Sequence, residues 1–587
     1  MAVEDYHQTV RDHDGLDSGA SSVTEVPPRS RAGFTAGQPL GNISGRDPSL
    51  LVSPTETQAP SRDEMWTSSD EKEDYERQES ERDDGDQYDG DHDLARTETG
   101  KSIAETLSLP REMLFVTIIC FGQLFTQAGL GQAISIIKYI GDSFDITNPG
   151  ELSWFMAGYS LTIGTFILFS GRLGDLFGHK TLFLIGMGWY SVWSVVCGFA
   201  IYSNHVLFIF ARVLQGIGPA IVLPNGLAIL GVTYAPGRRK EMVFALFGAT
   251  APSGAVLGSL FASLLALEWW PWAFWVFGIV LAAVMVIGHF AIPAAANRQH
   301  HERPQGWKNT LRQLDIGGTL LGVAGLVLIN FAWNQAPIVG WPQPYVYVTL
   351  IVGLILLAAF FVFELKYAEY PLIPFHALSN EVSFVLGAIA CGWSCFGIWF
   401  FYCWQFQLNL IGDSPLLATA KFSPAAVSGL CAAMFTGYML HRLKPPVVMM
   451  MALVAFTTGI TVLATCPVDQ IYWAQLFVSV VVMPWGMDMS FPAATLILSN
   501  AVHRKHQGIA ASLVNTVVNY SISLGLGFAG TVEVQVNNGG ENPADILKGY
   551  RGAFYMGIGL AGLGVFVCLA FVAKSRTQRH VSDKEDA

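Results

Sequence analysis

The chain of 587 residues is too apolar for an ordinary soluble domain. Hydrophobic residues make up 51% of it and charged residues only 14%, and its mean hydropathy is +0.39. Its net charge of −12 resides largely in the N-terminal stretch, which excludes a basic surface for nucleic acid and says little about a ligand of the remaining chain. This composition predicts an all-α membrane protein.

The first predicted region, residues 1–108, is polar. It is rich in Ser, Asp, Glu, Arg and Pro, and acidic residues dominate from Asp63 to Asp93. A segment of this composition cannot bury a core, so we expect a disordered acidic tail. No apolar stretch follows a basic start in the first thirty residues, so the sequence does not indicate a cleaved signal. The first membrane helix is then expected to direct insertion, with the tail in the cytosol.

About fourteen membrane spans follow the tail, because a span needs about 20 mainly apolar residues. They are predicted near 112–137, 151–170, 181–202, 205–231, 242–266, 271–292, 315–335, 344–363, 382–410, 422–440, 447–465, 471–499, 508–532 and 551–573. Lys and Arg gather in alternate loops, such as 238–240, whereas the opposite loops hold only Lys138, Lys421, Lys548 and Arg551. The positive-inside rule therefore predicts that both termini are cytosolic.

A weak internal repeat predicts two halves. A basic loop leads into the small-residue segment 244–258 in the fifth span, and a similar loop leads into 510–525 in the thirteenth. Transporters built from such repeats bind their substrates near the bilayer midplane. The predicted organisation after the tail is a six-helix N-terminal half (109–292), an inside loop with a central helix pair (293–380), a six-helix C-terminal half (381–573) and a cytosolic C-terminal tail (574–587).

The segment between the second and third spans is charged and spaced by glycines. Gly171 and Gly178 permit a tight turn, while Arg172, Asp175 and Lys180 supply charge on the cytosolic side. We expect a gating loop from residue 171 to residue 180, and the alternative is an ordinary basic inside loop.

The fifth span carries a predicted helix-packing motif. Small residues at this spacing let helices approach closely, and a proline permits bending. The motif is expected to be a contact that rocks during transport, and it consists of Gly248, Pro252, Gly254 and Gly258.

Only two charged residues lie well inside the predicted spans, Arg212 in the fourth and Asp488 in the twelfth. Charge in lipid is costly and usually functional. Arg212, followed by Gln215, can bind an anion, pair with a carboxylate or modulate a proton carrier, and its alternative is a structural tether to backbone carbonyls. Asp488 can shuttle a proton, and its alternative is a structural ion pair or a helix cap.

Further polar and aromatic residues could line a substrate path. Amides beside aromatic rings suit a cavity for an organic molecule, although polar residues also hold helices together and about half of these are expected to be structural. These candidates are Gln123 and Gln127 in the first span, Trp399 and Gln405 in the ninth, and Asn515 and Asn519 in the thirteenth.

No motif for catalysis is present in the sequence. It has no Gly-x-Ser-x-Gly elbow, no His-Glu-x-x-His and no glycine-rich nucleotide loop ending in Gly-Lys-Ser or Gly-Lys-Thr. All eight cysteines fall in or beside apolar segments, which favours packing over disulfides or metal binding. We therefore expect no enzyme activity, no cofactor and no metal, and an ion gradient as the energy source.

Two motifs carry a family resemblance. The segment Gly171 to Lys180 resembles the signature between spans two and three of the major facilitator superfamily, and Arg212-Val-Leu-Gln215-Gly216 resembles its fourth-span motif. With about fourteen spans, the chain is similar to the fungal drug:proton antiporter family 2, and the segment 484–494 is similar to its aminotriazole-resistance branch. The resemblance covers roughly residues 110–575. This chain departs from the family at Leu176, where the family usually has a basic residue. It also departs at Ala251, because the family has a glycine directly before the proline that is Pro252 here.

The resemblance implies a transport function. That family exports small organic toxicants in exchange for protons, and some members of the branch resemble borate exporters or low-affinity ammonium carriers. It also implies that spans one, four, nine and twelve line the cavity. Many members carry a carboxylate in span one, where this chain has Gln123 and Gln127, so Asp488 becomes the main candidate for the proton carrier.

The sequence therefore predicts proton-coupled efflux of small organic toxicants or metabolites across the plasma membrane by alternating access. The expected partners are a small-molecule substrate, protons and the lipid bilayer, with no nucleic acid, and a monomer is expected. One alternative is transport of a small inorganic solute such as ammonium or borate. Another is a non-transporting nutrient sensor that signals through the acidic tail.

Overall fold

The computed structural model describes residues 102–294 except 147 and 236, together with 306–373, 380–501 and 507–585. Nearly all of the predicted acidic tail lies outside these residues. The described segments fold into helices, and fourteen of these helices are long and apolar enough to span a membrane. The predicted all-α membrane fold is therefore confirmed.

Six long helices form the N-terminal group. Proline at the first turn of α4 and α8 suits a helix start, because its missing N–H would have no partner there. In this group α2 packs on α7, α6 packs on α4 and α5, and α5 packs on α8. The helices are α2 (Leu109–Ser135), α4 (Pro149–Phe177), α5 (His179–Phe199), α6 (His205–Thr233), α7 (Arg238–Leu265) and α8 (Pro271–Ala291), with the short η2 (Ile103–Thr106), α3 (Ile137–Ser143) and η3 (Ala200–Tyr202) beside them.

The C-terminal group begins with α12 (Asn380–Gln405), which continues into a π-helical turn, η6 (Phe406–Ile411). Within this group α15 and α14 pack on α16, and α12 packs on α17 and α18. The remaining helices are α13 (Pro415–Phe422), α14 (Pro424–Leu440), α15 (Pro445–Ala464), α16 (Gln475–Ala501), α17 (Gln507–Val536) and α18 (Pro543–Glu585).

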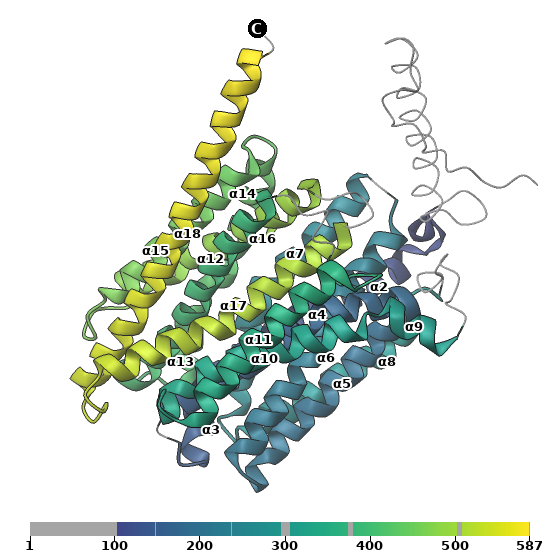
Figure 1. Cartoon of the computed structure of the whole chain (residues 1–587). Helices are drawn as coiled ribbons and strands as arrows, with labels where there is room; N and C mark the ends of the chain where they lie inside the picture. Colours follow the sequence, from purple (N-terminus) through teal and green to yellow (C-terminus); the bar gives the residue numbers. More distant parts are fainter. Residues whose placement is uncertain are drawn as a thin grey trace, which may run out of the picture. The chain divides into compact units, whose positions relative to one another are not determined.

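A central pair of spans, α10 (Ile316–Val339) and α11 (Pro344–Lys366), connects the two groups, and the short α9 (Trp307–Gln313) precedes it. The helix α10 packs on α4 of the first group and on α17 of the second, as Figure 1 shows. The groups also meet directly, because α4 packs on α17 and α7 packs on α13 and α14. The fold is thus two groups of six spans joined along a seam, with an additional pair of spans against that seam.

Backbone contact makes the α4–α17 part of this seam tight. A Cβ atom on Gly164 of α4 would lie 2.6 Å from the backbone nitrogen of Tyr520 in α17. Nearby, the hydroxyl of Ser523 donates a hydrogen bond of 2.8 Å to the carbonyl oxygen of Ala157. Small residues and interhelical hydrogen bonds are what hold helices together in a membrane.

Two details differ from the sequence prediction of the spans. The eighth span ends at Lys366 and the thirteenth at Val536, so Glu364 and Glu533 lie inside spans and are buried. Glu364 and Glu533 are thus two further buried charged residues, close to the ends of their helices. Hydropathy places the end of a span where apolar residues stop, whereas a polar side chain with a partner in the bundle lets the helix continue.

The predicted loop from residue 171 to residue 180 is also much shorter than expected. The helix α4 continues to Phe177 and α5 begins at His179, so only Gly178 separates them, with a φ of 97° that favours glycine. Gly174 lies within α4, where a Cβ atom would come within 1.9 Å of Asn225 Oδ1 in α6. Gly174 therefore serves helix packing, and Gly178 makes the turn.

The packing of α2 against α7 predicts the effect of a side chain at Gly258. Its Cβ atom would lie 2.3 Å from the carbonyl oxygen of Ala128, a backbone atom that cannot rotate away. We expect Gly258→Val to lower the free energy of unfolding by about 1–3 kcal/mol, seen as a lower melting temperature of the purified protein. Gly248→Val is the matched control, because this glycine lies in the same helix and has no atom within 4 Å of its Cβ position. Equal melting temperatures for the two variants would contradict the packing argument.

Candidate substrate and proton site

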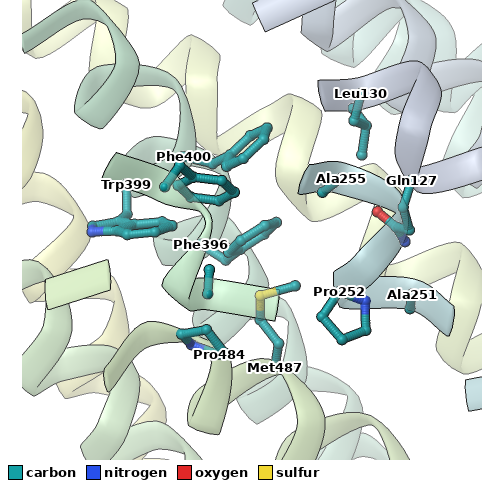
Figure 2. Close-up of a pocket in the computed structure, with 12 residues that line it drawn as sticks. Gln127, Leu130, Ala251, Pro252, Ala255, Phe396, Trp399, Phe400, Pro484 and Met487 are labelled. Carbon is teal, nitrogen blue, oxygen red and sulfur yellow. The ribbon is translucent and has the colours of Figure 1, made fainter. Parts of the chain in front are cut away.

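A narrow cavity of about 30 Å³ lies at the seam between the two groups of spans. Its wall is mainly apolar and aromatic, and both groups contribute to it. Figure 2 shows Phe396 and Met487 on one side of this space, with Gln127 and Pro252 on the other. The residues that line it are Gln127 and Leu130 of α2; Ala251, Pro252 and Ala255 of α7; Phe396, Trp399 and Phe400 of α12; Phe422 of α13; Ala425 of α14; and Pro484 and Met487 of α16.

Two of the lining residues are prolines inside helices, Pro252 in α7 and Pro484 in α16. A proline within a helix removes one backbone hydrogen bond and weakens the helix at that point. Because one proline belongs to each group of spans, the two walls of the cavity can each bend locally.

Asp488 lies one turn after Pro484 on α16 and directly after the lining residue Met487, but it does not itself line the cavity. Its Oδ2 atom is buried and has no hydrogen-bond partner among the described residues. The space for the carboxyl group exists because residue 429 of α14 is a glycine, whose Cβ atom would lie 2.9 Å from Oδ2 and 2.6 Å from Cβ of Pro252. An unpaired carboxyl group inside a membrane protein is costly, so a proton or a cation is its expected partner.

This arrangement predicts that Gly429→Ala disturbs the Asp488 environment. The added methyl group must displace the carboxyl group or push Pro252 of α7 away, so we expect transport activity to fall severalfold and stability to fall by about 1–3 kcal/mol. Gly437→Ala on the same helix is the matched control, since nothing lies within 4 Å of its Cβ position. The comparison requires initial transport rates and melting temperatures of both variants. A Gly429→Ala protein as active as the control would contradict this placement of Asp488.

The predicted path residues of the first and ninth spans differ in position. Gln127 and Trp399 line the cavity, whereas Gln123, half-buried one turn away from Gln127, does not. The indole nitrogen of Trp399 donates a hydrogen bond of 2.8 Å to the hydroxyl of Ser479, which fixes the ring against the cavity. Gln405 is buried further along α12, where its Oε1 atom lies 3.5 Å from Nδ2 of Asn409.

Arg212 lies within the N-terminal group and does not line the cavity. It is fully buried, and its Nε and Nη2 atoms each donate a hydrogen bond of 2.9 Å, to the carbonyl oxygens of Phe155 in α4 and Gly129 in α2. Its Nη1 atom donates to the side chain of Gln215, which in turn donates to Ser194 of α5 at 2.7 Å. This geometry is the tether between helices that the sequence left open as the alternative to a substrate role.

Two tyrosines, Tyr159 and Tyr190, belong to the same buried group of side chains as Arg212. The guanidinium carbon lies 4.5 Å from the ring centroid of Tyr159, a cation–π contact. The hydroxyl of Tyr159 is 2.8 Å from that of Tyr190, and the two hydroxyls also contact the backbone carbonyls of Thr126 and Phe125, each at 2.8 Å. Four helices of the N-terminal group are thereby joined around one buried charge.

The side-chain amides of Asn515 and Asn519 form hydrogen bonds within their own helix, α17. Each amide donates a hydrogen bond to a backbone carbonyl one turn earlier in α17, at 3.1 Å from Asn515 to Ala511 and 3.0 Å from Asn519 to Asn515. Neither residue lines the cavity.

The residues of the predicted gating segment tie several helices together. Lys180 donates to the carbonyl oxygens of His289 and Ile292 at the end of α8, at 2.8 and 2.6 Å. Asp175 lies 3.4 Å from His179 one turn later. Arg172 reaches away from α4 to the region around α9 and α11, and Gly171 lies near α17, with Ser512 Oγ at 3.8 Å from its Cβ position.

Glu533 on α17 is a buried polar residue that the sequence interpretation missed. The hydroxyl of Tyr402 donates a hydrogen bond of 2.7 Å to Glu533 Oε2, and the Tyr402 ring packs edge-on against Tyr550. Asn409 of the π-helical turn donates to the Tyr550 hydroxyl at 3.2 Å. A carboxylate directly beyond the predicted end of a span was the available signal. Glu533 does not line the cavity.

The sequence of this chain is matched by a known family model. The model of the Major Facilitator Superfamily matches residues 119–527 and 430–587. The chain belongs to the Major Facilitator Superfamily. The predicted resemblance is thereby confirmed, and members of the superfamily are transporters that act on small molecules from within a lipid bilayer.

Curated relatives extend this assignment to fungal transporters. A low-affinity ammonium transporter of Saccharomyces cerevisiae is 54% identical over 81% of this chain and 92% of its own length. The efflux pump terJ of Aspergillus terreus is 49% identical, with 82% and 92% covered. The aminotriazole resistance protein of S. cerevisiae is 40% identical, with 79% and 84% covered, which agrees with the predicted branch.

Solved structures of superfamily members share the fold. The peptide transporter POT, in its complex with sulfate, aligns with a TM-score of 0.57 at 14% identity and covers 79% of this chain and 94% of its own. At this identity the likeness supports the helical arrangement and not a substrate.

Proposed function

We propose that this transporter exports small organic compounds across the plasma membrane in exchange for protons. The observation that carries the proposal is the cavity at the seam, where an aromatic and apolar wall lies beside the carboxyl group of Asp488. Apolar walls with few polar groups suit organic molecules, and an unpaired carboxyl group suits a proton. Relatives with the printed names efflux pump terJ and aminotriazole resistance protein support the outward direction.

The seam between the two groups of spans is the proposed site of movement during alternating access. The halves proposed from the sequence, 109–292 and 381–573, would rock about the contacts of α4 with α17 and of α7 with α13 and α14. The central pair within 293–380 would follow this movement, because α10 touches both α4 and α17. The alternation of Lys and Arg between loops supports cytosolic termini, and the proposed transporter works as a monomer.

A second candidate is the transport of a small cation such as ammonium. The relative that is 54% identical bears the name of a low-affinity ammonium transporter, and aromatic rings beside a carboxyl group can hold a cation as well as an organic molecule. The proposals of a borate carrier and of a nutrient sensor have no comparable observation. The tail through which a sensor would signal lies outside the described residues.

A resistance screen of expressing cells separates these candidates. A strain that lacks its own exporters is grown with and without the chain on a panel of organic toxicants, with borate, methylammonium and limiting ammonium included. The proposal predicts improved growth on organic toxicants together with lower cellular accumulation of the protective compound. Growth changes restricted to the ammonium and methylammonium plates would overturn the proposed substrate class and favour the second candidate.

A further inference from the structure

We propose that Asp315 and Glu364 together form a proton-binding site that fastens the segment after α11 to α10 and to the end of α4. This site is remote from the substrate cavity and goes beyond the proposed function. Under the proposed orientation it lies on the cytosolic side, where it would respond to cytosolic pH. It is built from four described parts of the chain, which are the end of α4, the α9–α10 junction, the end of α11 and residues 370–373.

Each of the two carboxyl groups accepts hydrogen bonds from the backbone near it. Asp315, 6% exposed, begins α10, and its Oδ1 accepts a hydrogen bond of 3.1 Å from the backbone nitrogen of Gly318. Glu364, 3% exposed, accepts hydrogen bonds from the backbone nitrogens of Leu372 and Ile373 at 3.2 and 3.4 Å. The two carboxyl groups also approach each other, because Asp315 Oδ2 and Glu364 Oε1 both lie close to the Cβ position of Gly318. The anchored segment therefore depends on the position of the Glu364 side chain.

The closeness of the two buried carboxyl groups favours a shared proton. Ionised carboxylates only accept hydrogen bonds, and Asp315 Oδ2 is buried with no donor among the described residues. A Cβ atom on Gly318 would lie 2.3 Å from that oxygen and 2.8 Å from Glu364 Oε1, so both oxygens converge above the same glycine. One proton between them changes two facing acceptors into an O–H···O hydrogen bond.

Arg172 supplies the balancing charge and a second fastening. Its Nη1 atom donates to the carbonyl oxygens of Gln313 and Tyr370 at 3.2 and 2.8 Å, and its Nη2 atom donates to that of Pro371. With one shared proton, the carboxyl pair carries a single negative charge against the single positive charge of Arg172. Without the proton, two buried negative charges face each other. The other charged groups on the surrounding elements are Asp175 of α4, Lys308 and Arg312 of α9, Lys366 of α11, and Glu369, which pairs with Arg312.

We call the anchored contact between Glu364 and the segment after α11 a latch. It is expected to hold this segment at lower pH and to release it at higher pH. When the proton is lost, repulsion between the carboxylates moves Glu364 away from the backbone nitrogens that it anchors. Since α10 packs on α4 and on α17, a change at its first turn reaches both halves of the transporter. The latch thereby couples cytosolic pH to the ease with which the halves move.

Hydrogen exchange of the full chain in lipid nanodiscs tests this site without any substrate. We expect the amides of Leu372 and Ile373 to lose about tenfold or more of their protection between mildly acidic and mildly alkaline pH, after correction for intrinsic exchange. Asp315→Asn should stay protected at both pH values. Its amide can donate to Glu364 while its oxygen still accepts from Gly318, and Asn tolerates the left-handed backbone at this position, where φ is 46°.

Two further variants complete the test. Glu369→Gln removes an exposed carboxylate of the same segment and should keep the pH response of the unaltered chain. Glu364→Ala removes the anchor and should leave the segment unprotected at both pH values. If the unaltered chain shows equal protection at both pH values, or if Asp315→Asn keeps the full pH response, the proposed proton site is overturned.

Discussion

Replacing Asp488 with Asn is expected to abolish transport driven by a pH gradient while exchange of substrate for substrate continues. Asn retains the size of the side chain beside Gly429 but cannot release or take up a proton in this range of pH. The measurement is the initial rate of substrate movement in proteoliposomes, with and without an imposed pH gradient. We expect the rate driven by the gradient to fall by about a hundredfold or more, since a positioned proton-transfer group typically contributes at least this factor.

Asp469→Asn is the control for this experiment. Asp469 is an exposed carboxylate in the segment between α15 and α16, so its removal changes the net charge of the chain by the same amount without touching the cavity. Its transport should keep the pH dependence of the unaltered protein. If Asp488→Asn still transports in response to the pH gradient at a comparable rate, Asp488 is not the proton carrier, and Glu533 becomes the next carboxyl group to substitute.

Replacing Arg212 with Leu is expected to be the most destabilising single change in the N-terminal half. It leaves three buried acceptors without their donor, namely the carbonyl oxygens of Phe155 and Gly129 and the side-chain oxygen of Gln215. We expect a loss of about 3–5 kcal/mol in the free energy of unfolding, seen as a much lower melting temperature and a low yield of folded protein. Arg212→Lys should be intermediate, because an ammonium group cannot reach all three acceptors in the geometry of the planar guanidinium.

Arg442→Leu controls for the loss of one positive charge. Arg442 is exposed after α14, where its guanidinium carbon lies 4.6 Å from the Tyr438 ring centroid. Its melting temperature should stay close to that of the unaltered chain. An Arg212→Lys protein that is fully stable but does not transport would contradict the tether and would place Arg212 in the transport path instead.

The number of spans could be predicted from the sequence because hydropathy records directly which segments tolerate lipid. The turn at Gly178 could not be delimited in this way. Gly174 looks like a turn residue in the sequence, but in the structure it lies within α4, where this helix passes close to Asn225 of α6. A glycine that serves a turn and a glycine that serves a close helix contact have the same local signature.

The cavity was predicted in part, and the reason lies in side-chain direction. Gln127, Trp399 and Asp488 do gather at the seam, as expected of the first, ninth and twelfth spans. Arg212 belongs to an expected cavity helix, yet its side chain points into the packing between helices of its own half. Hydropathy gives the depth of a residue in a span, but its hydrogen-bond partners come from other helices and are not visible in a single sequence.

The carboxyl groups near span ends show the same limit. Glu364 and Glu533 lie directly beyond the predicted ends of their spans, where a charged residue is ordinary. Both are buried with hydrogen-bond partners that hydropathy does not reveal. Glu364 accepts from the backbone nitrogens of Leu372 and Ile373, and Glu533 accepts from the hydroxyl of Tyr402.

The most direct test of proton-coupled export is whether substrate movement itself drives proton movement. Proteoliposomes with a pH-sensitive dye inside are prepared with equal pH on both sides and are given a gradient of a substrate found in the resistance screen. The proposed antiport predicts that protons move opposite to the substrate, that the signal disappears with a proton ionophore, and that Asp488→Asn abolishes it. Substrate movement down its gradient with no change in internal pH would contradict the proposed coupling.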